Sequence, residues 1–357
     1  MKTRTVRMAA AGVAVLALTG GQLLMASQAQ AVAPSAVWIE AGTLRFQDVS
    51  NVQNNVTLAL VGSSYELTDS LGNVSAQWPC AAVSAHRVRC PAGSVSRYSF
   101  SFLAGNDRLV NTTKLPGYAF GGTGHDLLIG GFGAEILSGE AGNDSVMGRL
   151  GNDRLYGGTG IDWVRYDDRS APVRVRLDNT VADDGQPNIG EKDLVWPDIE
   201  NANGGASNDL LVGSNGSNWL AGLGGNDSIF GQGGNDRLTP DLGKDRVYGG
   251  TGAYDYIDYT TRTVAVRVTL HDGTANEGQT GEGDYADAGV EGILGGQSSD
   301  YLVGNNGNNV IQGAAGNDRI YALGGNDSLY GGLGSDYGNG GLGSDFCSSV
   351  ESKVSCP

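Results

Sequence analysis

The sequence predicts an all-β protein, a parallel β-roll or β-solenoid of nonapeptide repeats that follows a small N-terminal β segment. Three observations support this fold class. An acidic or amide residue recurs every nine positions over long stretches, and an apolar residue stands two positions after most of them. Glycine supplies 59 of the 357 residues, against roughly 7% in average proteins, which favours many tight turns over one thick core. No stretch after residue 31 has the apolar periodicity of an amphipathic helix.

The nine-residue spacing runs through three sets and never slips within a set. The positions are Asp126, Glu135, Asp144, Asp153 and Asp162; then Asp209, Asn218, Asp227, Asp236 and Asp245; then Asp300, Asn309, Asp318, Asp327, Asp336 and Asp345. A short repeat that stays in phase is typical of a solenoid, in which each unit stacks on its neighbours.

One unit, "GGTGHDLLI" at residues 121–129, has six turn residues followed by three strand residues. Two units make one coil with a turn at each edge, so turns 18 residues apart should stack at the strand spacing of ~4.8 Å. This places Asp126, Asp144 and Asp162 on one edge, and Glu135 and Asp153 on the other. The apolar eighth position of each unit should then line a thin core, at Leu128, Leu137, Val146, Leu155, Val164, Ile229, Leu238, Val247, Ile320 and Leu329.

The chain is expected to begin with a signal peptide at 1–31, because three basic residues precede an apolar run and "AQA" at 29–31 matches a cleavage site. The mature protein would then be secreted and extracellular. The remaining chain divides into an N-terminal β-rich segment, 32–116; three repeat blocks, 117–165, 204–258 and 295–348; two mutually similar connecting segments, 166–203 and 259–294; and a C-terminal disulfide cap, 349–357.

Four cysteines stand in two close pairs, and an even count in an exported chain favours disulfides. Three pairings are open, and proximity along the chain favours Cys80–Cys90 and Cys347–Cys356. The first pair is expected to close a hairpin. Gly338 and Cys347 replace the apolar residue of their units, which indicates an end cap that the second disulfide holds.

The formal net charge of −16 argues against nucleic acid and anionic membranes as partners and favours a cation. Stacked carboxylates repel one another, and glycine turns are costly to order. Calcium would neutralise the carboxylates and hold the turns in place, since it takes six to eight oxygens from carboxylates and backbone carbonyls. The three histidines are not clustered, whereas zinc and copper prefer nitrogen or sulfur donors and magnesium demands stricter octahedral geometry. Ca²⁺ is therefore the predicted cofactor.

Residues 121–165, 204–248 and 295–348 resemble the RTX, or haemolysin-type, calcium-binding repeat, Gly-Gly-x-Gly-x-Asp-x-apolar-x. The resemblance implies a parallel β-roll that holds calcium in its turns, with carbonyl ligands from the turn glycines. It implies carboxylate ligands at Asp126, Glu135, Asp144, Asp153, Asp162, Asp209, Asp227, Asp236, Asp245, Asp300, Asp318, Asp327, Asp336 and Asp345.

Some units depart from this pattern. Glu135 replaces aspartate, and its side chain is expected to reach the cation differently. Asn218 and Asn309 carry no charge, so their turns are expected to bind calcium weakly or not at all. An extra residue precedes Asp255 and is expected to disturb that turn.

Residues of the connecting segments have two interpretations. The acids Asp183, Asp184, Glu191, Asp193, Glu277, Glu282 and Asp284 are interpreted as solvated loop charge, with an additional cation site as the alternative. Gly185 and Glu191 have EF-hand spacing, but Thr180 and Ala182 stand where that loop requires acids. The tryptophans Trp163, Trp196 and Trp219 are interpreted as packing residues rather than as a carbohydrate platform.

These observations predict a secreted calcium-binding protein that folds as it binds the ion and is not an enzyme. No His-Glu-x-x-His, Gly-x-Ser-x-Gly or complete P-loop motif occurs. Two alternatives stay open: a cell-surface adhesin or scaffold with an extracellular protein or polysaccharide partner, and a polysaccharide-modifying enzyme. After residue 31, no run of residues is long and apolar enough to span a bilayer.

Overall fold

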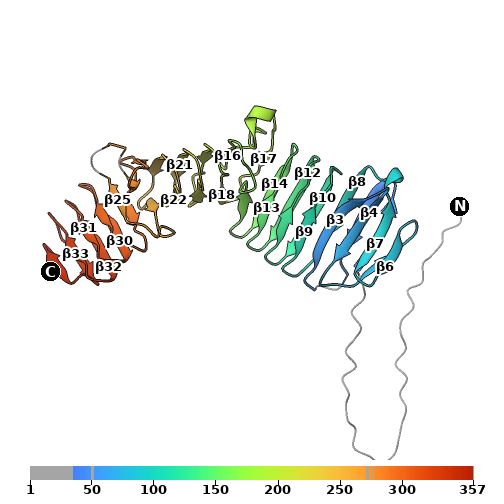
Figure 1. Cartoon of the computed structure of the whole chain (residues 1–357), viewed down its shortest axis with the longest axis horizontal. Coiled ribbons are helices and arrows are strands. Elements are labelled where there is room, and N and C mark those ends of the chain that lie inside the picture. The colour runs from blue at the N-terminus through green and yellow to red at the C-terminus, as the bar shows by residue number, and fades with distance from the viewer. Residues whose placement is uncertain (1–34, 50–51, 271–272, 276, 357) are drawn as a thin grey trace, which may run out of the picture. The chain divides into compact units, whose positions relative to one another are not determined.

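The computed structural model of the chain describes residues 35–49, 52–270, 273–275 and 277–356, and Figure 1 shows their arrangement. The predicted signal peptide lies outside the described residues. These ranges contain β-strands and two short 3-10 turns, Ala92–Ser94 and Pro187–Ile189, and no α-helix. The expected all-β class is confirmed. No helix that could cross a membrane occurs among the residues described.

Strands one coil apart pair in parallel. β11 (Leu127–Ile129) pairs with β13 (Ser145–Met147), and β12 (Glu135–Ala141) pairs with β14 (Arg154–Thr159). Leu128 lies opposite Val146 in the first pair, which is a step of two nonapeptide units. Turns one full coil apart are therefore neighbours, as the period predicted.

One face of the coils is a single 16-stranded sheet. From the N-terminal end its strands are β6 (Ala81–Ser84), β7 (Arg87–Pro91), β4 (Ser64–Asp69), β3 (Asn55–Val61), β9 (Arg108–Asn111), β11, β13, β15 (Trp163–Arg165), β18 (Asn201–Asn203), β20 (Trp219–Ala221), β22 (Arg237–Thr239), β24 (Tyr256–Asp258), β28 (Gly292–Leu294), β30 (Val310–Ala315), β32 (Ser328–Leu333) and β34 (Phe346–Ser348).

The opposite face is divided into three sheets, of eight, five and six strands. The first contains β5 (Val74–Ala76), β1 (Ser35–Glu40), β2 (Thr43–Gln47), β8 (Arg97–Ser101), β10 (Gly117–Thr123), β12, β14 and β17 (Leu194–Val195); the second β16 (Arg174–Arg176), β19 (Leu210–Val212), β21 (Ser228–Gly233), β23 (Arg246–Thr251) and β27 (Tyr285–Ala286); the third β26 (Gly278–Gln279), β25 (Val266–Thr269), β29 (Tyr301–Val303), β31 (Arg319–Tyr321), β33 (Tyr337–Asn339) and β35 (Ser352–Val354). Each division falls at a connecting segment, and both segments contribute strands to the two faces.

The core lies between the two faces and takes one apolar residue from most strands of the repeat blocks. Every apolar residue predicted at the eighth position, from Leu128 to Leu329, is fully buried. Because side chains of a strand alternate between faces, the residues on either side of each apolar position point outward. A three-residue strand can therefore supply only one core side chain.

The N-terminal segment is continuous with the repeat coils. β8 pairs in parallel with β2 on one side and with β10 on the other. The antiparallel pairs β3–β4, β4–β7 and β6–β7 close this end. The predicted Cys80–Cys90 disulfide is present and adjoins the hairpin of β6 and β7, so the expected hairpin pairing is confirmed.

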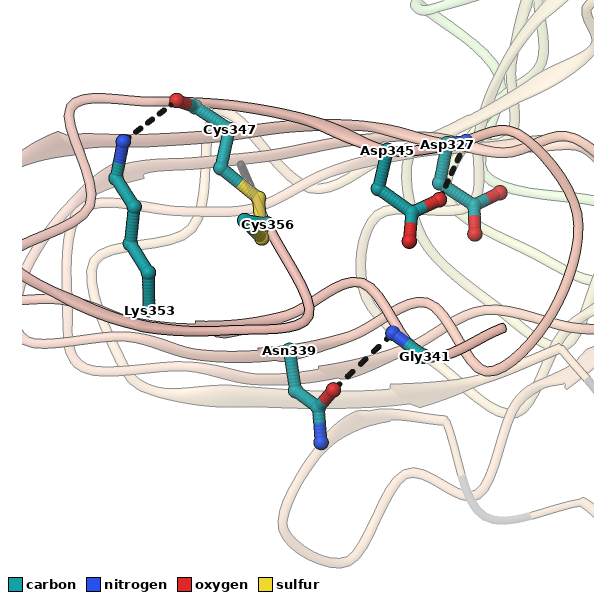
Figure 2. Close-up of a disulfide and its surroundings, with 7 residues drawn as sticks. All are labelled: Asp327, Asn339, Gly341, Asp345, Cys347, Lys353 and Cys356. Atoms are coloured by element: carbon teal, nitrogen blue, oxygen red, sulfur yellow. Dashed lines mark hydrogen bonds between the residues drawn. A yellow bond between two sulfur atoms is a disulfide. The ribbon is translucent and has the colours of Figure 1, made fainter. Parts of the chain in front are cut away.

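The C-terminal end is closed by the last strands and the second predicted disulfide, Cys347–Cys356, which Figure 2 shows. The Lys353 Nζ donates a hydrogen bond to the Cys347 carbonyl oxygen at 2.8 Å. The side chain of Val350 fills the space where a Cβ of Gly338 would stand. The missing apolar residue at position 338 is thus replaced by a valine from the cap.

Candidate metal sites

The predicted ligands stand directly before strands, at the two edges of the coils, and they are buried. Asp126, Asp144 and Asp162 precede β11, β13 and β15, while Asp153 precedes β14. Each of these four carboxylates is at most 2% exposed. Aspartate is rarely buried so completely without a partner, so the arrangement requires a compensating interaction.

One oxygen of each carboxylate holds successive coils together. The backbone N–H of Asp126 donates to Asp144 Oδ1 at 2.7 Å, and that of Asp144 donates to Asp162 Oδ1 at the same distance. On the other edge the N–H of Glu135 donates to Asp153 Oδ1 at 2.8 Å. The second and third blocks repeat these bonds, at Asp209–Asp227, Asp227–Asp245, Asn218–Asp236, Asp300–Asp318, Asp318–Asp336, Asn309–Asp327 and Asp327–Asp345.

The second carboxylate oxygen is buried and accepts no hydrogen bond in all but two of the predicted ligands. These oxygens are Oδ2 of Asp126, Asp144, Asp153, Asp162, Asp227, Asp236, Asp245, Asp318, Asp327, Asp336 and Asp345, and Oε2 of Glu135. A buried charged oxygen without a partner costs several kcal/mol by order of magnitude, so such groups are normally paired or bound to metal.

A backbone carbonyl lies beside several of these oxygens. A Cβ added to Gly121 would collide with both Asp126 Oδ2 and the carbonyl oxygen of Gly139 in the next coil. Gly231 and Gly313 each lie beside an equivalent pair, one carboxylate oxygen and one carbonyl oxygen. A carboxylate oxygen without a donor and a carbonyl oxygen thus converge where only glycine leaves room, and a cation is the group that such a cradle fits.

The pKa values of the buried acids also favour a bound cation between the coils. The pKa of Asp126 is raised to about 7, mainly by burial and also by the charges of Asp144 and Asp107, against the lowering effect of the Asp107 N–H. Burial, with the charges of Asp245 and Asp209, raises the pKa of Asp227 to about 8. A raised folded-state pKa favours the protonated acid, so the contribution of these acids to stability is greatest below about pH 4 and is lost as the pH rises through about 7 to 8. At neutral pH the ionised acids therefore oppose folding unless a cation neutralises them.

The donors are carboxylate and carbonyl oxygens, the ligand set that calcium prefers. Within the described ranges no group of three or more His, Cys, Asp or Glu side chains is arranged to hold a metal. The cradles instead pair a carboxylate with a main-chain carbonyl.

The two asparagines satisfy their surroundings without a cation. Asn218 Nδ2 donates to the carbonyl oxygen of Glu200 at 2.7 Å, and Asn309 Nδ2 donates to that of Glu291 at 3.0 Å. Their Oδ1 atoms accept the N–H of Ser214 and Asn305. These contacts support the expectation that the two turns bind calcium weakly or not at all.

Asp209 and Asp300 differ from the other predicted ligands, because both oxygens of each already accept hydrogen bonds. Asp209 Oδ2 accepts the Gly205 N–H, and Asp300 Oδ2 accepts the Gly296 N–H. Each is the first acid after a connecting segment. They present no unpaired oxygen and are the weakest candidates among the predicted ligands.

Several acids outside the predicted ligand set occupy equivalent places. The N–H of Asp162 donates to Glu200, that of Asp153 to Asp193, that of Asp245 to Asp284 and that of Asp336 to Glu351. The "GND" at 105–107 places Asp107 in the row before Asp126. The nine-residue phase could not reveal these acids, because insertions separate them from their neighbours by irregular distances.

The extra residue before Asp255 does not displace that acid from its row, contrary to expectation. The N–H of Asp236 donates to Asp255 Oδ1 at 2.8 Å, and Asp255 is fully buried. Glu291 continues the row, because one of its oxygens accepts the N–H of Asp255. The turn absorbs the insertion on its outer side.

The interpretation of the connecting-segment acids as solvated loop charge was wrong for most of them. Asp184, Glu191, Asp193, Glu277 and Asp284 are buried, because these segments form coils of their own. Asp183 and Glu282 are half-buried and form ion pairs with Arg174 and Arg262.

The tryptophan contacts support a packing role. The rings of Trp163 and Trp219 meet edge to face with centroids 5.1 Å apart, and Arg237 lies over the Trp219 ring at 4.0 Å. Trp196 packs against Tyr156 with centroids 5.3 Å apart. These contacts cover part of each ring, although Trp196 and Trp219 remain 37% and 36% exposed.

Comparison with known families places these turns in context. The family model of the RTX calcium-binding nonapeptide repeat, which spans four copies, matches residues 118–146, 129–164, 203–238, 224–254, 294–329 and 313–347. A search of curated proteins found no match. The matched ranges contain every predicted ligand, and RTX nonapeptide repeats bind calcium. Between residues 118 and 347, therefore, the chain carries several copies of the RTX calcium-binding nonapeptide repeat.

Proposed function

We propose that this protein is a secreted calcium-binding protein whose glycine-aspartate turns ligate Ca²⁺ and which folds as it binds. The buried carboxylate oxygens without hydrogen-bond donors carry the proposal. When bound, the ion supplies positive charge between adjacent coils. The ligands with such an oxygen are the strongest candidates, and Asp209 and Asp300 are retained as the weakest.

The residues of each turn perform separate parts of this binding. Oδ1 of an aspartate such as Asp144 fixes the spacing of the coils through its bond to the earlier N–H. Oδ2 and the facing carbonyl then offer oxygens to the ion. A site filled at 100 times its dissociation constant adds roughly 2.7 kcal/mol to folding stability, so several sites dominate the stability of a thin core.

Two disulfides support an extracellular location, since such bonds persist in oxidising compartments. RTX repeats are typically calcium-binding and structural rather than catalytic, and we propose no enzymatic activity. An adhesin or scaffold role would add a partner to the same calcium-dependent surface.

The proposal is tested by circular dichroism of the mature protein in excess Ca²⁺ and in excess EGTA. We expect most β structure to be lost in EGTA and to return when Ca²⁺ is restored. A matched sample with EGTA already saturated by Ca²⁺ controls for the chelator. An unchanged spectrum in EGTA would contradict the proposal.

A further inference from the structure

The first two rows of acids on the divided face each end at a connecting segment, and their last acids, Asp193 and Asp284, are held differently from the rest. The N–H of Asp153 donates to Asp193 Oδ1 at 2.9 Å, as elsewhere in the rows. Asp193 Oδ2, however, accepts the hydroxyl of the fully buried Tyr166 at 3.0 Å. Both oxygens of this acid are bonded to protein donors, whereas Oδ2 of Asp153 has none.

A buried arginine completes this arrangement. Arg169, 5% exposed, donates from Nη2 to Glu191 Oε1 at 2.9 Å. The same nitrogen donates to the carbonyl oxygen of Arg149, which belongs to the turn that precedes Asp153. The guanidinium therefore links a carboxylate to a turn carbonyl, the two kinds of oxygen that a calcium ion links within the blocks.

The second connecting segment repeats this structure with its own residues. The N–H of Asp245 donates to Asp284 Oδ1 at 3.0 Å, and Asp284 Oδ2 accepts the Tyr259 hydroxyl at 2.9 Å. Arg262 Nη2 donates to Glu282 Oε2 at 3.0 Å. In both segments the arginine lies over the tyrosine ring, at 5.8 and 6.0 Å from its centroid.

At the other edge of the coils, the rows of acids also change directly after each connecting segment. Asn218 and Asn309 are the first residues of their rows after the connecting segments, and their Nδ2 atoms donate to the carbonyls of Glu200 and Glu291. Hydrogen-bond donors thus stand on both edges where the repeat blocks present unpaired oxygens.

We propose that the connecting segments are cation-independent junctions, in which Tyr166 with Arg169, and Tyr259 with Arg262, take the place of a calcium ion beside Asp193 and Asp284. A guanidinium repels a divalent cation, and the tyrosine hydroxyl occupies one lone pair of the Oδ2 atom and the space beside it in which a metal would bind. The calcium sites then form three separate groups instead of one continuous column. The proposal rests on the proposed function.

Terbium anomalous scattering from crystals of the full calcium-loaded chain tests the proposal directly. We expect peaks between the coils of the blocks, for example beside Asp144 and Asp227, and none within coordination distance of Asp193 or Asp284. A peak at either of these acids, with peaks also in the blocks, overturns the junctions alone. A map without peaks anywhere overturns the proposed calcium binding as well.

Substitution gives a second test in solution. Tyr166→Phe combined with Arg169→Gln frees Asp193 Oδ2 and removes the guanidinium, so we expect one additional calcium ion per chain by isothermal titration calorimetry. The matched control is Tyr321→Phe with Arg319→Gln on β31, where the side chains flank the buried Ile320 and face outward; its stoichiometry should not change. If the junction variant folds and binds the original number of calcium ions, the proposal is contradicted. If the variant does not fold, the terbium map of the unsubstituted chain is the deciding test.

Discussion

The aspartate at the sixth position of a unit uses its two oxygens for different purposes. In Asp144, Oδ1 accepts the N–H of Asp126 and sets the distance between coils, while Oδ2 is left without a donor. Asparagine can still link coils, as Asn218 does through Nδ2, but it brings no charge to a cation. Under the proposed function, the carboxylate therefore serves the ion rather than the contact between coils.

Asp144→Asn should remove one calcium site while leaving the coils linked. We expect a loss of roughly 2.7 kcal/mol of calcium-dependent stability at 100 times the dissociation constant, measured by thermal unfolding with and without Ca²⁺. Asp209→Asn is the matched control, because both oxygens of Asp209 already accept N–H groups. Equal losses in the two variants would contradict the role given to the unpaired oxygen.

The glycine at the first position of a unit is required by the space that the ligands use. A methyl group on Gly121 would displace Asp126 Oδ2 from the carbonyl of Gly139. We expect Gly121→Ala to weaken calcium binding at this turn at least tenfold, as measured by titration calorimetry. Gly224→Ala has open space around its Cβ and should bind as the wild type does; similar weakening there would point to a general backbone effect.

At the scale of the strand, stability comes from one buried apolar residue per short strand and from pairing with both neighbours. Val146 and Leu155, on opposite faces, are fully buried in this way. An end strand lacks one neighbour, so each end of the stack needs another constraint. Antiparallel pairing provides it at β3 and β4, and the Cys347–Cys356 disulfide provides it beside β34.

Replacing both Cys347 and Cys356 by serine should loosen the last coils only. A disulfide across a short loop contributes about 2–3 kcal/mol through the entropy of the unfolded chain. In saturating Ca²⁺ we expect hydrogen exchange to accelerate in β34 and β35 and to stay unchanged in β11 and β13. Acceleration throughout the chain would instead show that the cap controls the whole stack.

At the scale of the whole molecule, the net charge of −16 and the buried acids lead us to expect a fold that depends on counter-ions. The unpaired oxygens repeat along both edges, so no single site decides the outcome. Each ion should stabilise the coils on either side of it, and binding should be coupled to compaction of the chain.

Calcium should compact the chain where magnesium does not. Magnesium requires near-ideal octahedral geometry and retains its water, whereas the cradles combine carboxylate and carbonyl oxygens fixed by the coil spacing. We expect the hydrodynamic radius in equal millimolar Mg²⁺ to match that in EGTA, measured by size-exclusion chromatography with light scattering. Compaction by Mg²⁺ at the same concentration would remove the argument for calcium.

The repeat phase alone was enough to predict the β-solenoid, the buried residues from Leu128 to Leu329, and the edge on which each acid of a set lies. These features depend on contacts between residues 18 positions apart, and a constant offset is visible in the sequence. Both disulfide pairings were also predicted, since the cysteines of each pair are close along the chain.

Other features depended on contacts that no constant offset describes. Asp153 meets Asp193 across 40 residues and Asp162 meets Glu200 across 38. The insertions between them made Asp193 look like solvated loop charge and left Glu200 outside the predicted set. The sequence likewise could not show that Asp209 has donors for both oxygens, or that Tyr166 and Arg169 donate to Asp193 and Glu191. Such roles depend on which N–H, hydroxyl or guanidinium reaches each oxygen, and only the folded coils bring those groups together.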